Sequence, residues 1–207
     1  MRQIAYNRTV RTEKPRYIVV HTTGNPSRGA DARAHFDYWN SREVGASADF
    51  VVDDKEVLQI NDYTKYYTWH CGDGKGKYGI TNSNSIGIEI CVNADGDFAK
   101  AVSNAVALVR KLKKETGIVK IVRHYDASRK NCPAELSDNN WEGWGKFLEQ
   151  VYAAEPSELT EVNDIVWELA YRGVVTNKEL WLRKLNEDAN VYWLARKCVN
   201  YMRGKNV

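Results

Sequence analysis

Apolar β-branched runs predict the strands of this protein. The run Tyr17–Thr23 is apolar and ends in polar residues, so we expect a buried strand whose C-terminal end carries His21. A later strand is expected to deliver His124 in the same way. The further strands are expected at residues 50–52, 57–60, 85–90 and 118–122, with a short extended segment at 67–70.

Alternation of apolar and polar positions is strictest in the segment Ser85–Ile90. Its three isoleucines share one face, whereas Gly87 and Glu89 share the opposite face. The carboxyl group of Glu89 is therefore predicted to project from the face of the strand that the isoleucines do not occupy.

An apolar period of about 3.6 residues predicts the helices. The longest helix is expected over residues 98–116, where Gly117 stops it. Shorter helices are expected at about residues 30–42 and 139–152, and residues 125–133 are expected to form a loop. Strands that alternate with helices predict an α/β fold, a central mixed β-sheet flanked by helices.

The pattern changes at residues 155–157, where Glu-Pro-Ser interrupts it. No strand pattern follows this break, and a small helical module is expected instead. We therefore predict two domains, residues 1–154 and 157–207. With about 50 residues, the second domain is marginal as an independent core.

Three short amphipathic helices are expected in the second domain. The first is predicted over residues 159–171. The second opens with a capping-box pattern at Thr176–Glu179. The third carries an apolar stripe that includes Leu194 and Cys198.

Composition excludes several classes of protein. The 207 residues carry 30 Lys+Arg against 27 Asp+Glu, and a net charge of +3 is too small to indicate a nucleic-acid partner. No apolar run approaches the roughly 20 residues that span a bilayer, and no apolar segment follows Met1–Asn7, so neither membrane insertion nor a signal peptide is expected. The four cysteines form no CxxC pair, which together with the expected lack of a signal peptide favours a reducing compartment.

Two histidines and one cysteine stand out as potential metal ligands. His21 lies at the end of one expected strand, His124 follows another, and Cys132 lies eight residues further on. Zinc binds imidazole nitrogen and thiolate sulfur, and three protein ligands leave its fourth position open for water. Spacing alone does not separate such a site from ordinary packed or surface histidines.

Four short motifs occur in this chain in one order. They are Val-Val-His21-Thr-Thr, Trp69-His70-Cys-Gly-Asp-Gly, Asn84-Ser-Ile-Gly-Ile-Glu89-Ile and Arg123-His124-Tyr-Asp-Ala-Ser-Arg-Lys130-Asn-Cys132-Pro133. The set resembles the zinc-dependent N-acetylmuramoyl-L-alanine amidases, the family that also includes the peptidoglycan recognition proteins. It is most similar to the phage endolysins in that family, and the resemblance covers roughly residues 15–152.

The resemblance implies one Zn²⁺ ion held by His21, His124 and Cys132. It also implies cleavage of the amide that joins N-acetylmuramic acid to the L-alanine of the peptidoglycan stem peptide. Glu89 would pass the proton of the attacking water to the leaving amine, and Lys130 would face the oxyanion. A paired or surface carboxylate and a solvated loop lysine are the alternatives for these two residues.

Trp69 and His70 are predicted to bind substrate, because they are expected to line a groove beside the zinc, with the loop at residues 72–79 forming one rim of that groove. A core tryptophan and a merely packed histidine are the alternatives. His70 is in addition a reserve candidate for a fourth metal ligand.

Residues 47–50 depart from the pattern of the family. Some short phage amidases place a catalytic Tyr just before the Phe of the second strand, and Ser47-Ala48-Asp49-Phe50 offers none. The acid–base role therefore falls on Glu89. Many relatives have a His where Asp49 stands, so a substrate contact from that position is not carried over.

The resemblance implies a peptidoglycan hydrolase of the phage or prophage endolysin type. Such a protein accumulates in the host cytoplasm and reaches the cell wall after a holin opens the membrane. One alternative is a zinc-holding peptidoglycan-binding module without hydrolysis, against which Glu89, Lys130 and Cys132 argue together. Another is a zinc peptidase acting on the stem peptide, whose commonest motif, His-Glu-x-x-His, is absent.

Endolysins commonly join a catalytic domain to a wall-binding module, so wall binding is the first expectation for residues 157–207. Aromatic rings suited to stacking on sugars are supplied by Tyr171, Trp181, Tyr192 and Trp193. Burial of these rings in a small core, docking onto the catalytic domain and a homo-oligomer formed through the C-terminal helices are the alternatives.

Overall fold

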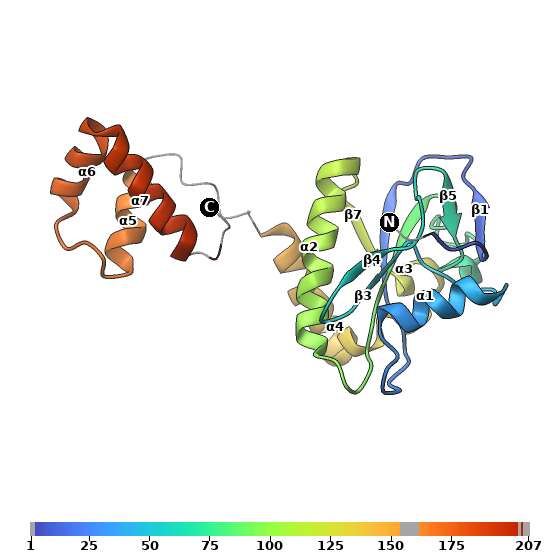
Figure 1. The fold of residues 1–207 in the computed structure, drawn as a ribbon. Helices are drawn as coiled ribbons and strands as arrows, with labels where there is room; N and C mark the ends of the chain where they lie inside the picture. Colours follow the sequence, from blue (N-terminus) through green and yellow to red (C-terminus); the bar gives the residue numbers. More distant parts are fainter. Residues whose placement is uncertain (1–2, 154–161, 203, 205–207) are drawn as a thin grey trace. The chain divides into compact units, whose positions relative to one another are not determined.

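A mixed β-sheet of five strands lies at the centre of the first part of the chain (Figure 1). The computed structural model describes residues 3–153, 162–202 and 204. In spatial order the strands of the sheet are β4 (Val57–Gln59), β3 (Phe50–Val52), β6 (Ser85–Ile90), β2 (Tyr17–Thr22) and β7 (Lys120–Arg123). β3 and β4 form an antiparallel hairpin, and the other neighbouring strands are parallel.

Helices cover both faces of this sheet. α2 (Phe98–Thr116) and α4 (Asp138–Tyr152) pack on one face, and α1 (Ala32–Ser41) packs on the other. α2 begins after Asp97, whose side chain accepts a hydrogen bond from a first-turn N–H, and it ends at Gly117 with a left-handed φ of 73°. The predicted α/β fold, a central mixed sheet flanked by helices, is confirmed.

The alternation in β2 and β6 decides which side chains enter the main core. The two strands pair in parallel, with His21 opposite Glu89 and Val19 opposite Gly87. The three isoleucines of β6 are fully buried against α2 and α4. His21, Gly87 and Glu89 therefore point to the other face of the sheet, where polar groups can gather.

A short helix, α3 (His124–Ser128), replaces the first part of the loop predicted for residues 125–133. Its first turn is closed by Asp126, whose carboxylate accepts hydrogen bonds from the backbone N–H of Arg123 at 2.9 Å and from the guanidinium of the same residue. Five residues are too few to display a helical period, so no pattern of apolar positions indicates this helix.

Two further strands, β1 (Arg8–Val10) and β5 (Tyr66–Thr68), form a separate antiparallel pair. β5 corresponds to the extended segment predicted at residues 67–70. β1 is not predicted, because three largely exposed residues carry no alternation that could indicate a strand. Single 3₁₀ turns lie at Gly72–Gly74 and Ala134–Leu136.

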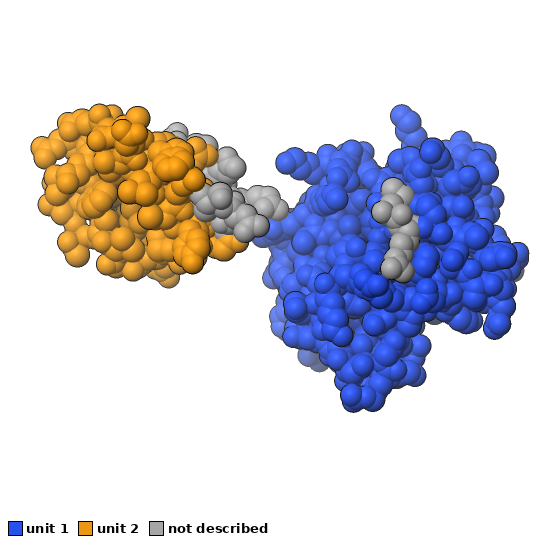
Figure 2. Space-filling model, viewed as in Figure 1, with its two compact units in different colours: residues 1–153 blue, residues 154–207 orange. Residues whose placement is uncertain are grey.

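The chain divides into two compact units, residues 1–153 and 154–207 (Figure 2). The described part of the second unit comprises α5 (Val162–Tyr171), α6 (Lys178–Glu187) and α7 (Ala189–Met202), which share an apolar core of their own. The predicted boundary at residues 155–157 and the predicted helix start at 159 lie outside the described residues. None of the described helices combines the length and the apolar character needed to cross a membrane.

Two details of the second unit differ from the sequence-based prediction. Asn177 caps α6 in place of Thr176, because its side chain accepts a hydrogen bond from the N–H of Leu180 at 3.0 Å. Leu194 is 60% exposed and Cys198 is also exposed. The apolar stripe of α7 is therefore narrower than predicted, because a unit of three short helices buries only a thin face of each one.

Candidate metal centre

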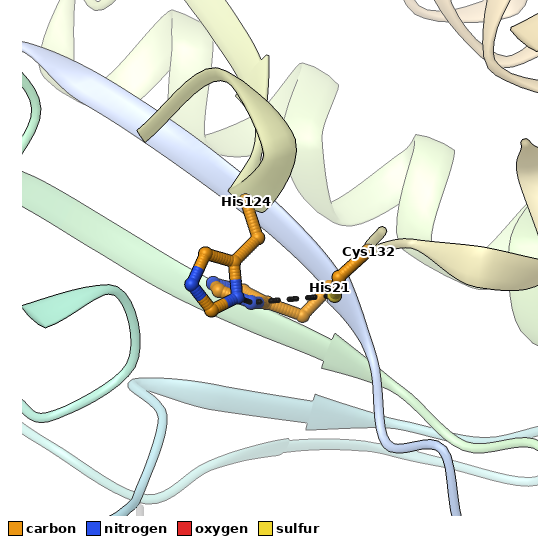
Figure 3. A group of neighbouring side chains, drawn as sticks. All are labelled: His21, His124 and Cys132. Carbon is orange, nitrogen blue, oxygen red and sulfur yellow. Dashed lines mark hydrogen bonds between the residues drawn. The ribbon is translucent and has the colours of Figure 1, made fainter. Parts of the chain in front are cut away.

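Two histidines and a cysteine meet at the carboxyl ends of β2 and β7 (Figure 3). His21 lies near the end of β2, and His124 directly follows β7, which pairs with β2 in parallel. Cys132 comes from the segment after α3, where its carbonyl oxygen accepts a hydrogen bond from the N–H of Tyr125 at 3.0 Å. The three potential ligand atoms lie within 4.8 Å of one another, because parallel strands end at the same edge of a sheet.

The three side chains face one another through defined atoms. His21 Nδ1 lies 3.0 Å from His124 Nδ1 and 3.7 Å from Cys132 Sγ. All three residues are buried. Burial lowers the pKa of His21 well below its usual value and raises the pKa of the Cys132 thiol to about 12. The cluster thus combines a neutral imidazole with a thiol that needs a strong positive charge in order to ionise.

The second ring nitrogen of each histidine has a partner outside the cluster. His124 Nε2 lies 2.7 Å from a carboxylate oxygen of Asp73, in the loop at residues 72–79. His21 Nε2 lies 3.0 Å from Nδ1 of His70, and Nε2 of His70 lies 3.1 Å from the hydroxyl of Ser85. Outer contacts of this kind orient histidines that bind metals. Nδ1 of His21 consequently faces the thiol, and Nδ1 of His124 faces Nδ1 of His21.

Glu89 lies beside the cluster on β6, opposite His21 in the sheet register. Its Oε1 atom lies 4.0 Å from Nδ1 of His21, and its Oε2 atom is buried with no hydrogen-bond partner among the described residues. Burial raises the pKa of Glu89 to about 8, although the positive charge of Lys130 opposes this shift. A carboxyl group with these properties is suited to accept a proton and to return it near neutral pH.

An open cavity of about 650 Å³ lies over the cluster. Glu89, Lys130, Trp69 and His70 all line this cavity together with the cluster. The residues to which the sequence assigns catalytic, metal-binding and substrate-binding roles therefore border one space. None of the lining residues comes from the loop at 72–79, which was expected to form a rim and which instead supplies the carboxylate that contacts His124.

Helix α1 supplies a wall of the cavity that the sequence does not indicate. The lining residues from this helix are Ala34, His35, Tyr38 and Trp39. They form two pairs spaced four residues apart, which places them on adjoining stripes of one helix face. The spacing of these residues in the sequence indicates that they share a helix face. Nothing in the sequence indicates that this face borders the site instead of packing fully into the core.

Asp49 is fully buried between β3, β5 and β6 and is not among the residues that line the cavity. Its carboxylate accepts hydrogen bonds from the side-chain amide of Asn61 at 2.7 Å, the hydroxyl of Thr68 at 3.0 Å and the N–H of Gly87 at 2.8 Å. Burial raises the pKa of Asp49 to about 6 against the effect of these bonds. Asp49 therefore links strands beside the site and does not face the substrate.

Replacing Asp49 with asparagine is expected to change how the stability of the first unit depends on pH. The pKa of Asp49 rises on folding from 3.8 to about 6. The contribution of protonated Asp49 to the free energy of unfolding is therefore fully present below pH 3.8 and is lost as the pH rises through 6. The loss is about 3 kcal/mol. The D49N variant has no charge to bury at any pH, so its free energy of unfolding in urea should improve by that amount relative to wild type between pH 3 and 7.5.

The control for this measurement is Asp95→Asn. The side-chain hydrogen bond from Asn93 lowers the pKa of Asp95 to about 2, so its stabilising effect is lost at low pH and the difference from wild type should change in the opposite direction. Parallel pH profiles for wild type and D49N would contradict the raised pKa of Asp49.

Gly87 is the position on β6 that makes room for His70. A Cβ atom at residue 87 would lie 2.6 Å from Cγ of His70, which is closer than side chains pack. Gly87→Ala is therefore expected to displace the imidazole and to lower the free energy of unfolding by about 1–3 kcal/mol, as measured in urea. Gly145→Ala in α4 is the matched control, because nothing lies within 4 Å of a Cβ atom there and the change should stabilise slightly. Equal stability of G87A and wild type would contradict the close packing.

The fold and the cluster define a class of protein: an α/β domain in which a potential metal site at the ends of parallel strands opens into a cavity beside a buried acid. The profile of the N-acetylmuramoyl-L-alanine amidase family matches residues 11–135, and the chain belongs to this family. The resemblance that the four sequence motifs indicate is thereby confirmed.

Individual relatives agree with this assignment. The chain is 43% identical over 143 residues to the N-acetylmuramoyl-L-alanine amidase CwlH of Bacillus subtilis (strain 168), which covers 68% of this chain and 54% of CwlH. The catalytic domain of XlyA matches with a TM-score of 0.62 and 41% identity, over 72% of this chain and 94% of that domain. A mutant endolysin from Bacillus subtilis matches with a TM-score of 0.63 and 42% identity, over 73% and 99% of the two chains. The chain spans about half the length of the curated relatives it matches.

Proposed function

We propose that this protein is a zinc-dependent N-acetylmuramoyl-L-alanine amidase, which hydrolyses the amide between the lactyl group of N-acetylmuramic acid and the L-alanine of the stem peptide. The observation that carries the proposal is the cluster of His21, His124 and Cys132 in an open cavity, beside the buried carboxyl group of Glu89. The amidase activity named for the relatives supports the same substrate.

The donor atoms of the cluster fit a zinc ion. Tetrahedral zinc with usual bond lengths places two nitrogen ligands about 3.3 Å apart and a nitrogen and a sulfur ligand about 3.5 Å apart. The corresponding distances here are 3.0 Å and 3.7 Å. A buried thiol with a pKa of about 12 ionises only beside strong positive charge, which a divalent cation supplies. His21, His124 and Cys132 would hold the ion.

The side chains around the cluster divide the chemistry of amide hydrolysis between them. A zinc ion in such a site supplies a Lewis acid that polarises a carbonyl group and makes water more acidic. Glu89 accepts the proton of the attacking water and then donates it to the nitrogen of L-alanine as the C–N bond breaks. Lys130 lines the same cavity, and its positive charge stabilises the oxyanion of the tetrahedral intermediate.

The test is cleavage of purified muropeptides by the full chain, with and without a chelator, followed by mass analysis of the new ends. Free stem peptide that begins with L-alanine, lost with chelator and restored by added zinc, is the expected result. A cut within the stem peptide would identify a peptidase instead. Zinc binding without any cleavage would identify a peptidoglycan-binding module, and either outcome would overturn the proposed activity.

We propose further that the second unit binds the cell wall. Several of its aromatic rings are exposed to solvent: Trp167 by 64%, Tyr171 by 89%, Trp193 by 56% and Tyr201 by 79%. The ammonium groups of Lys178 and Lys197 lie 3.6 Å and 4.0 Å from the ring centres of Trp167 and Trp193. Rings of this kind can stack on sugars. Trp181 and Tyr192, by contrast, pack against the core.

Exchange of both exposed tryptophans in the full chain tests the role of the second unit. The double variant W167A/W193A is expected to sediment with purified walls about tenfold more weakly than wild type while it cleaves soluble muropeptides at an unchanged rate. Unchanged sedimentation of the double variant would contradict the proposal that these rings bind the wall. The alternative is a homo-oligomer that forms through the C-terminal helices, and sedimentation equilibrium of wild type and of W167A/W193A tests it.

We also propose that the protein acts as a phage or prophage endolysin, which collects in the host cytoplasm and reaches the wall after a holin opens the membrane. Its structural similarity to a protein described as an endolysin supports this role. Expression in a host bacterium should cause lysis only when a holin is produced as well. Lysis by the protein alone would contradict release through a holin.

A further inference from the structure

We propose that His70 is a positioning residue of the metal centre: it fixes the tautomer of His21, so that the lone pair of His21 Nδ1 points at the metal. The proposal builds on the zinc site of the proposed function. Both ring nitrogens of His70 are engaged, one with His21 at 3.0 Å and the other with Ser85 at 3.1 Å. Because both nitrogens already have partners, the contacts of His70 fit a positioning role better than a role as a fourth metal ligand.

The protonation of His70 follows from the hydroxyl of Ser85. A serine hydroxyl has one hydrogen, and here it donates that hydrogen to the carbonyl oxygen of Thr81. The hydroxyl therefore accepts its hydrogen bond from His70, and Nε2 of His70 carries the hydrogen. The ring is buried, its partners are uncharged groups, and a neutral imidazole has a single N–H. Nδ1 of His70 is consequently an acceptor.

The tautomer of His21 follows in turn. Because Nδ1 of His70 accepts, Nε2 of His21 must donate across the 3.0 Å contact, and Nδ1 of His21 is left without a hydrogen. That atom faces His124 and Cys132. Asp73 produces the same result at His124, because a carboxylate can only accept from Nε2. A neutral partner at His21 achieves this without placing a second negative charge beside the thiolate.

The backbone around His70 holds the ring in place. The side-chain oxygen of Asn82 accepts hydrogen bonds from the N–H groups of His70 at 3.0 Å and Cys71 at 2.8 Å. The rings of His70 and His21 meet edge to face, with centres 5.1 Å apart and planes at 88°. Gly87 leaves the space that the ring occupies. Besides its contact with His21, the position of His70 is thus set by Asn82 and Gly87, which are not among the proposed ligands.

A matched pair of variants tests the proposal in the full chain. Asparagine and leucine have nearly the same shape, but only asparagine offers an acceptor close to the position of the imidazole Nδ1. H70L is expected to weaken zinc binding by about 10–100-fold, measured by competition with a chromophoric chelator, whereas H70N stays within about threefold of wild type. Equal losses in both variants, or wild-type affinity in H70L, would overturn the role of His70.

A second measurement is independent of zinc and of activity. Long-range ¹H–¹⁵N correlation spectra of the metal-free protein should show His21 protonated at Nε2 in wild type and H70N, and as a mixture of tautomers in H70L. An unchanged His21 tautomer in H70L would refute the proposal even if the protein binds zinc. Failure of the wild-type chain to bind zinc would instead refute the proposed metal centre.

Ser85→Ala keeps the proposal testable if H70L does not fold. Without the hydroxyl, His70 is free to place its hydrogen on Nδ1 and to reverse the direction of its bond with His21. We expect zinc affinity to fall by about threefold to tenfold and the His21 spectrum to show both tautomers. A S85A protein with wild-type zinc affinity and a single His21 tautomer would overturn the chain of hydrogen bonds.

Discussion

The E89Q variant is expected to bind zinc as tightly as wild type and to cleave muropeptides with a kcat lowered by about a thousandfold. Glutamine has nearly the size of glutamate but can neither take up nor release a proton. The carboxyl group is suited to that task, because Oε2 has no partner among the described residues and burial raises the pKa of Glu89 to about 8. Initial rates of L-alanine amine release, together with zinc content by atomic absorption, measure the two effects separately.

Glu135→Gln is the matched control for E89Q. Glu135 is exposed and close enough for its charge to help raise the pKa of Glu89, yet it is not among the residues that line the cavity. Its replacement should leave kcat within about twofold of wild type. Activity of E89Q above a tenth of wild type would remove Glu89 from proton transfer, and loss of zinc from E89Q would assign it to the metal site instead.

Cys132→Ala is expected to lower zinc affinity by on the order of a thousandfold or more and to abolish cleavage, because it removes the anionic donor from the three proposed ligands. The Sγ atom lies 3.7 Å from Nδ1 of His21, and no other sulfur belongs to the cluster. Added zinc should raise the Tm of wild type by mass action and leave that of C132A unchanged. Thermal unfolding of wild type and C132A with and without added zinc measures these two responses of the Tm.

Cys91→Ala is the control, because it removes an equally buried thiol outside the cluster. Cys91 is 2% exposed, and its Sγ atom lies 4.0 Å from His35 Nδ1. C91A should lose some stability through the smaller side chain and keep the rise in Tm with zinc. If C132A and C91A respond to zinc alike, Cys132 is not a ligand.

Elements long enough to repeat a pattern could be predicted from the sequence with their bounds, and a shorter element could be predicted only where its residues form an apolar run, as at Phe50–Val52. Ser85–Ile90 alternates over six residues and Phe98–Thr116 holds a helical period over 19 before a glycine, and both elements have the predicted bounds. β1 has three residues and α3 has five, which is less than either pattern needs. For Leu194 the pattern predicts a place on the apolar stripe, but the side chain is exposed, because an apolar residue on a short helix need not be buried.

By itself, the sequence determined the family, the α/β fold and the identities of the residues around the site, because the four motifs specify residue types in a fixed order. Only the tertiary structure decided how these side chains are turned. The orientation of an imidazole depends on the partners of its two nitrogens, and those partners, Asp73 and Ser85, lie in distant segments that only packing brings together. The orientation of His70 also depends on the space that Gly87 leaves for its ring, and the sequence does not indicate that these two residues are in contact.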